Sequence, residues 1–269
     1  MQKPWEFTVL ALYYGNPDPD HLSCIKKVVE AGIPFIPIRD CPYLDIARSF
    51  ALAEGRRLTP EAKAFIFIDH DMIFNLEAVV GLTQRLIEKD LDVAAVAYSM
   101  RKPGFMYSFK PLEKTQIDFY VPGHELAEYA GTGFLAINKK VVDKLDEIMP
   151  TYFFTVTEKS YKPYFERYIQ DGKYCVDDVG FCYRVRDLGF KVWIDTLPRI
   201  YHRGKYDYAL EDGGLSIPNF DKLTVNFDPS RNIKSDAWVG PIQPAESSGP
   251  SESNTSITEA DGLVPLKAG

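Results

Sequence analysis

A short apolar run that ends in two aspartates constrains this chain more than any other stretch. Residues 64–74 read A-F-I-F-I-D-H-D-M-I-F, and the aromatic and β-branched residues 65–68 predict a strand buried on both faces of a parallel sheet. Asp69 and Asp71 follow at the carboxyl end of that strand, the edge where open α/β sheets place their ligands. We therefore expect an α/β fold with a polar site at this edge.

The two aspartates suit a divalent metal ion. Mg²⁺ and Mn²⁺ prefer oxygen ligands, and an ion that bridges a diphosphate needs few of them from the protein, because phosphates and waters supply the rest. Asp69 and Asp71, one residue apart, meet this need. Acidic residues after a strand also cap helices and form turns, and this simpler role stays open for the D-H-D sequence.

Composition narrows the class of protein and of partner. The 269 residues, 45% of them hydrophobic, suffice for one large domain or two small ones. A net charge of −7 provides no broad basic surface for nucleic acid, although it does not exclude nucleic acid as a substrate. The four cysteines lack C-x-x-C spacing, so we expect reduced and mostly buried thiols.

No segment of the sequence has the features of a membrane anchor. Residues 1–7 lack a basic region followed by an apolar core, and no apolar run approaches the ~20 residues of a membrane span. We therefore expect a cytoplasmic protein. After about Trp238 the composition shifts to Ser, Glu, Pro, Gly and Thr, which predicts a disordered tail at 239–269 behind a single domain at 1–238.

Strands and helices alternate along the first hundred residues, which favours a parallel sheet with helices on both faces. The patterns predict strands at residues 7–14, 35–38, 65–68 and 92–98, and helices from 20 or 23 to 30, from 44 to about 56, and from 76 to about 89. Beyond them, residues 100–129 and 151–173 are aromatic and irregular. Further strands are predicted at 134–137 and 191–194, and further helices at 139–149 and 179–188.

Three separated blocks carry a resemblance to a known family. They are D-H-D, G-T-G-F at 131–134, and D-D-V-G-F-C-Y-R-V-R-D-L-G-F-K-V-W-I-D at 177–195, which Y-H-R-G follows at 201–204. In this order and spacing they resemble GT-A-type nucleotide-sugar glycosyltransferases, most nearly the family-two-like proteins of bacterial and phage genomes. The resemblance implies a GT-A, Rossmann-like and mostly parallel sheet flanked by helices, with an irregular aromatic-rich acceptor region.

The resemblance also implies a metal site. Mn²⁺ or Mg²⁺ would bridge the D-x-D aspartates and the donor diphosphate, offsetting charge on the leaving group. By position, Asp71 would be the direct ligand, Asp69 would contact the ribose or reach the metal through water, and His202 would complete the set. For His202 the alternative is a loop histidine held by hydrogen bonds.

Asp177 and Asp178 stand where relatives carry an acidic pair at a helix start. In inverting members the second acid is the general base, so the resemblance implies Asp178 as base and Asp177 as an acceptor contact. Free N–H groups and the helix dipole also stabilise aspartates at a helix start, which leaves a structural alternative. Many relatives have Glu-Asp here, and the shorter side chain leaves the role of Asp177 open.

The donor side is expected to use the G-T-G turn and three residues nearer the N-terminus. Gly131 and Gly133 would let backbone approach a ligand, with Thr132 donating to a sugar hydroxyl, although a plain bulge or turn explains them equally. The remaining donor-side candidates are Tyr13 and Tyr14, which can stack on a uracil-like ring or pack internally, and Arg48, which can bind a phosphate or form a surface salt bridge. The other histidines are interpreted as structural or solvent-exposed: His21, His70 and His124.

These features support a metal-dependent glycosyltransferase that moves a hexose from a nucleoside diphosphate, preferably UDP, to a hydroxyl acceptor such as a glycan, a protein or a modified nucleic acid. A sugar nucleotidyltransferase shares the α/β sheet and acidic site, but usually has a Gly-rich loop where this chain reads Y-Y-G-N-P-D-P-D. A non-catalytic nucleotide- or carbohydrate-binding protein of the same fold is the third hypothesis. The sequence does not distinguish retention from inversion.

Overall fold

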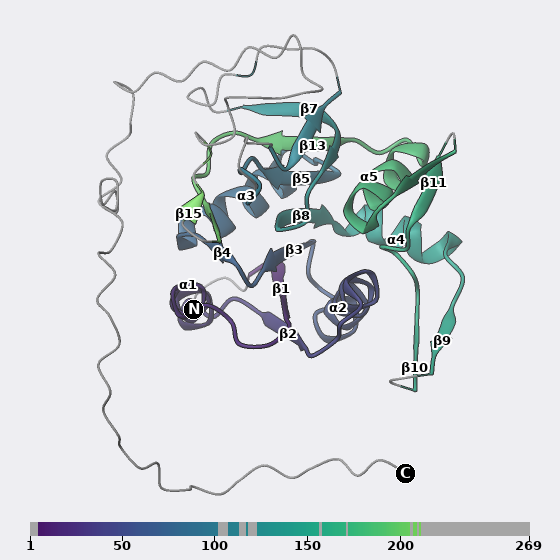
Figure 1. Cartoon of the computed structure of the whole chain (residues 1–269), viewed down its shortest axis with the longest axis horizontal. Helices are drawn as coiled ribbons and strands as arrows, with labels where there is room; N and C mark the ends of the chain where they lie inside the picture. The colour runs from purple at the N-terminus through teal and green to yellow at the C-terminus, as the bar shows by residue number, and fades with distance from the viewer. Residues whose placement is uncertain are drawn as a thin grey trace, which may run out of the picture. The chain divides into compact units, whose positions relative to one another are not determined.

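The computed structural model in Figure 1 describes residues 5–101, 107–112, 117, 123–155, 158–170, 172–204, 207–208 and 210. The predicted tail and its boundary at 238/239 lie outside these residues. Within the described part of the chain, no helix combines the length and apolar character that crossing a membrane requires. The four cysteines carry free thiols; three of them are buried and Cys41 is partly exposed, which confirms the prediction.

The fold is α/β and is built on an eight-stranded sheet with the order β2-β1-β3-β8-β5-β13-β7-β6. Its strands are β1 (Phe7–Tyr13), β2 (Phe35–Arg39), β3 (Ala64–Asp69), β5 (Val93–Val96), β6 (Phe109–Pro111), β7 (His124–Ala130), β8 (Phe134–Asn138) and β13 (Val192–Asp195). The proline-containing β2 forms one edge, a position where a missing N–H costs no hydrogen bond of the sheet. Most strands run in one direction, but β7 and β8 run against their neighbours.

Strand β8 runs against its neighbours β3 and β5 inside a sheet that is mostly parallel, as expected. The chain enters β8 from the G-T-G turn, and the carbonyl of Gly133 accepts from the N–H of Asp69 at 3.0 Å. This turn therefore lies at the carboxyl end of β3, and a strand that starts there has to run back along β3. Because β8 lies between β3 and β5, it still forms part of the buried sheet.

Five helices of the described chain cover both faces of the sheet (Figure 1). One face carries α1 (Pro19–Glu30) and α3 (Leu76–Glu88), and the other carries α2 (Leu44–Leu58), α4 (Lys139–Ile148) and α5 (Asp177–Asp187). Residues 65–68 alternate between the two apolar cores, so β3 is buried on both faces, as predicted. Asn75 and Asn138 cap α3 and α4, and Asp18 caps α1, which begins at Pro19 and not at the predicted residue 20 or 23.

Three small sheets account for much of the aromatic and loop regions. Strands β9 (Tyr152–Phe154) and β10 (Lys159–Tyr161) form one antiparallel pair, and β11 (Tyr168–Gln170) and β12 (Lys173–Cys175) form another. The third sheet combines β4 (Met72–Ile73), β14 (Tyr201–Arg203) and β15 (Asp207–Tyr208). This last sheet joins the segment after D-H-D to the Y-H-R-G block.

Candidate functional site

Arg48 holds two of the predicted acidic residues together. It lies in the first turns of α2 and is 3% exposed, which corrects the alternative of a surface salt bridge. Its Nη2 atom lies 3.1 Å from Oδ2 of Asp69 at the end of β3, and its Nη1 atom binds Asp177 at the start of α5. Burial alone lowers the pKa of Arg48, but the two carboxylates outweigh burial and raise it. One guanidinium thus connects α2, β3 and α5.

Asp178 differs from its neighbour. Its Oδ1 atom accepts from the N–H of Val179 at 2.8 Å, and no basic side chain in the described residues forms an ion pair with it. Burial, followed by the negative charge of Asp177, raises the pKa of Asp178 above its ordinary value. A carboxylate with a raised pKa accepts a proton more readily at neutral pH than an ordinary aspartate does.

Asp71 and His202 meet across the small sheet that the sequence did not reveal. His202 of β14 lies opposite Met72 of β4, and the N–H of Arg203 donates to the carbonyl of Asp71 at 2.7 Å. As a result, Nε2 of His202 lies 3.5 Å from Oδ2 of Asp71. Both side chains are 14% exposed. The structure therefore brings these two predicted residues together from positions far apart in sequence.

The hydrogen bonds of His202 favour metal or proton binding between the two side chains. Nδ1 lies 3.1 Å from the carbonyl of Ser99, and because a carbonyl only accepts, Nδ1 is the donor. A neutral His202 therefore presents the lone pair of Nε2 to Asp71. Burial alone raises the pKa of Asp71, but a protonated His202, in which Nε2 carries a proton and donates to Asp71, and the charge of Arg101 outweigh burial, so the pKa lies below its usual value.

These residues fit a metal ion that takes its remaining ligands from substrate and water. Oδ1 of Asp71 is buried and has no hydrogen-bond partner, which leaves one carboxylate oxygen available. Ligating histidines commonly donate their other N–H to a carbonyl, as His202 does. Asp69 is bound to Arg48, and in the described part of the chain no three His, Cys, Asp or Glu side chains group closely enough to hold a metal. Two protein ligands are common for Mg²⁺.

Tyr98, which the sequence analysis missed, occupies the centre of the G-T-G turn. Its hydroxyl accepts from the N–H of Gly133 at 3.2 Å, and a Cβ on Gly131 or Gly133 would lie 2.6 Å from that hydroxyl. Its ring packs edge-on against His202, with centroids 5.3 Å apart. Thr132 is buried between the glycines, and its hydroxyl has no partner. Both glycines therefore have an internal reason to be small, and their predicted contact with a donor stays a prediction.

The predicted tyrosine pair divides into a buried and an exposed residue. Tyr13 is 4% exposed, and its hydroxyl lies 3.2 Å from Nε2 of His21, whose Nδ1 lies 2.9 Å from the carbonyl of Met72. Burial raises the pKa of Tyr13 to about 12. Tyr14 is 64% exposed. Of the pair, Tyr14 is therefore the residue with a ring face available for stacking on a base.

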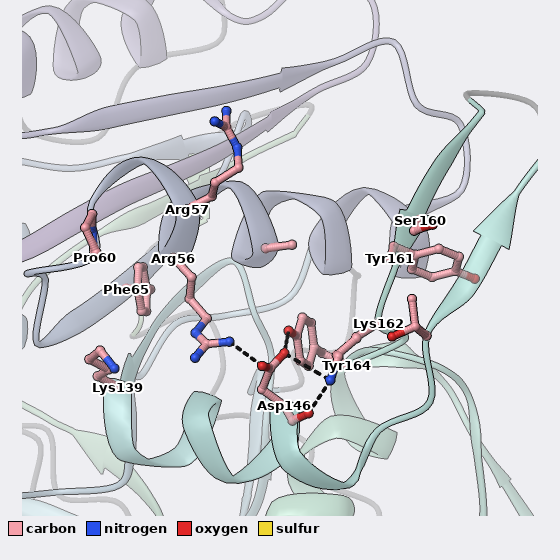
Figure 2. A pocket seen from close by; sticks show the side chains of 12 residues that line it. Arg56, Arg57, Pro60, Phe65, Lys139, Asp146, Ser160, Tyr161, Lys162 and Tyr164 are labelled. Atoms are coloured by element: carbon pink, nitrogen blue, oxygen red, sulfur yellow. Dashed lines mark hydrogen bonds and ion pairs between the residues drawn. The ribbon is translucent and has the colours of Figure 1, made fainter.

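A pocket of about 460 Å³ lies away from these acidic residues, at the opposite end of α2 from Arg48 (Figure 2). It is rich in cations, but Asp146 binds Arg56 at 2.7 Å and Lys162 at 3.5 Å, as the dashed lines in Figure 2 show. Tyr164 donates to Asp146 at 2.7 Å. These contacts join α2, α4 and the segment after β10, so we interpret them as structural.

Comparisons with known proteins support the fold. No protein-family model matches the sequence, and no curated protein matches it. The solved structure of A197 from STIV is similar, with a TM-score of 0.52 and 14% sequence identity over 74% of this chain and 86% of that chain. GalNAc-T7 with UDP, GalNAc and Mn²⁺ has a TM-score of 0.44 and 11% identity over 75% of this chain and 44% of that chain. The likeness to A197 concerns the fold, so function has to be argued from the site.

Proposed function

We propose that this chain is a metal-dependent glycosyltransferase that moves a sugar from a nucleoside diphosphate, by preference UDP, to a hydroxyl group. The observation that carries the proposal is the pair of Asp71 and His202, which face each other at 3.5 Å with a carboxylate oxygen and an imidazole lone pair available. The acidic pair at the start of α5 lies on the same edge, because Arg48 joins Asp177 to the end of β3.

The side chains divide the work of the reaction. Asp71 and His202 would hold Mn²⁺ or Mg²⁺, which when bound neutralises charge on the leaving diphosphate. Asp178 would take the proton from the acceptor hydroxyl. The oxygen of that hydroxyl would bond to the anomeric carbon of the sugar as the bond between this carbon and the diphosphate breaks. The raised pKa of Asp178 suits this role, and Arg48 holds Asp177 in a fixed position beside it.

Three substitutions separate binding from chemistry. Asp71→Asn should abolish Mn²⁺-dependent UDP binding in calorimetry, because an amide is a poor ligand for a hard cation. His202→Ala should weaken Mn²⁺ affinity about 10- to 100-fold. Asp178→Asn should leave Mn²⁺ and UDP binding intact and lower hydrolysis or transfer of a UDP-sugar about 10²- to 10⁴-fold.

A protein that only binds nucleotide or carbohydrate gives a different result. With Mn²⁺ and UDP-sugars it would bind the donor without any slow hydrolysis, and Asp178→Asn would then have no effect. Wild-type binding of Mn²⁺ and UDP by Asp71→Asn would reduce D-H-D to a turn and reject the proposal. Glu147→Gln, which removes an exposed carboxylate of α4, is the control for a change of net charge.

A further inference from the structure

Asp71 has a second basic partner, Arg101, which belongs to none of the sequence motifs described above. Nη2 of Arg101 lies 3.1 Å from Oδ2 of Asp71, the same oxygen that faces His202. Nη1 of Arg101 donates to the carbonyl of Arg203, in the strand that carries His202, at 3.3 Å. One guanidinium therefore bridges both sides of the proposed metal site.

Arg101 differs in solvent exposure from Arg48, the other arginine at this edge of the sheet. The side chain of Arg48 is 4% exposed and binds two carboxylates from different elements, so its departure would leave buried charges without a partner. The side chain of Arg101 is 48% exposed. Water can replace its protein contacts at little cost, as is usual for exposed ion pairs. Arg48 is thus a fixed partner, and Arg101 is an exchangeable one.

A divalent cation and the guanidinium compete for the same place. Two positive charges a few ångströms apart repel strongly even where solvent partly screens them. We propose that Arg101 is a built-in cation that neutralises Asp71 in the metal-free protein and leaves this carboxylate when a divalent metal binds. The inference rests on the proposed metal site, and it assigns to Arg101 a role in setting how tightly that site binds metal.

Calorimetric titration with Mn²⁺ alone tests this inference. Arg101→Gln removes the positive charge, so the metal no longer has to break an ion pair, and Mn²⁺ should bind about two- to fivefold tighter than to wild type. Arg57→Gln is the matched control, because Arg57 is 65% exposed and pairs with Glu54 within α2. It changes net charge equally and should bind Mn²⁺ as wild type does.

The outcomes distinguish this inference from the proposed function. Equal or weaker Mn²⁺ binding by Arg101→Gln, with wild-type binding that Asp71→Asn abolishes, would overturn the role of Arg101 and leave the metal site standing. Absence of Mn²⁺ binding at Asp71 in wild type would reject both. The melting temperature in EDTA checks the fold of Arg101→Gln and should fall by no more than about 3 °C, since a partly exposed ion pair contributes at most about 1 kcal/mol.

Discussion

At the scale of single residues, the space beside Gly131 is filled by the hydroxyl of Tyr98. A Cβ at position 131 would lie 2.6 Å from that hydroxyl and 3.3 Å from the carbonyl of Ser108. Gly131→Ala should therefore destabilise the protein by about 1–2 kcal/mol, the cost of overpacking less a small gain from restricting the unfolded chain. Urea unfolding measures this change.

The partner substitution shows whether the hydroxyl is the cause. Tyr98→Phe alone should cost about 1 kcal/mol, because the N–H of Gly133 loses its acceptor. In the Tyr98→Phe background, Gly131→Ala should be close to neutral, giving a coupling energy of about 1–2 kcal/mol. An equal loss in both backgrounds would mean that the carbonyl of Ser108, and not the phenol, requires glycine at position 131.

Residue type and place together made part of the site predictable. Asp71 could be proposed as a metal ligand because it follows a core strand and carboxylate is a recognisable ligand, whereas His202 was proposed from the family resemblance; both roles stay predictions. Tyr98 and Arg101 also lie just beyond a core strand, β5, but tyrosine and arginine there suggest no particular chemistry. The burial of Arg48 could not be predicted, because it depends on Asp69 and Asp177, which other elements bring to it.

At the scale of elements, the length of a helix or strand decided whether the sequence predicted it. The long amphipathic helices and the buried strands appear within a few residues of their predicted bounds. Strands β4 and β14 have two and three residues, too few for any periodicity, and within the described residues they pair with each other and β14 also pairs with β15. The contact between Asp71 and His202 depends on this pairing of short strands. The two residues could therefore be proposed from the sequence, but the contact between them could not.

Asp146 of α4 makes a contribution to the stability of the folded protein that depends on pH. Burial alone raises the pKa of Asp146, but hydrogen bonds from Tyr164 and Arg56 outweigh burial, and its pKa lies below the ordinary value (Figure 2). A lowered pKa in the folded state stabilises the protein above the unfolded-state pKa of about 3.9, and this stability disappears as pH falls through the folded pKa.

Asp146→Asn tests this at two pH values. At pH 7 it should lower the free energy of unfolding by about 1 kcal/mol, a modest value because the side chain is 31% exposed. As pH falls through the lowered pKa of folded Asp146, the variant and wild type should converge. Glu147→Gln in the same helix removes an exposed carboxylate and should change neither value. A difference that persists undiminished at low pH would assign the effect to packing.

At the scale of the whole molecule, two apolar cores pack on the two faces of one mixed sheet. Local sequence patterns predict where its strands lie, but they do not predict the direction in which each strand runs. The alternation of strands and helices predicted an α/β fold with helices on both faces, and the structure confirms it. Residues 124–129, predicted to be irregular, belong to the strand β7 of the same sheet. A hydrophobic run specifies that β8 is a strand, but not that it runs antiparallel. That direction follows from where the chain re-enters the sheet, which is a property of the complete connection.

Arg48 of α2 joins this helix to the end of β3 and to the start of α5. Arg48→Gln should therefore destabilise the protein far more than an ordinary surface change does. Asp69 and Asp177 would keep their charges in a largely buried position, with side chains 25% and 18% exposed. Loss of one partner from a buried ion pair costs about 3–5 kcal/mol, and this partial exposure favours the lower value.

A second substitution separates charge from packing. If unpaired carboxylates cause the loss, Arg48→Gln combined with Asp177→Asn should recover at least about 1 kcal/mol relative to Arg48→Gln alone, because one buried negative charge is gone. Urea unfolding at pH 7 measures both variants, with Arg101→Gln as the control for an exchangeable arginine at the same edge. Were Arg48→Gln to unfold at the same urea concentration as Arg101→Gln, the guanidinium of Arg48 would not hold this edge together. An additive loss in the double variant would instead assign the cost to the lost side-chain volume.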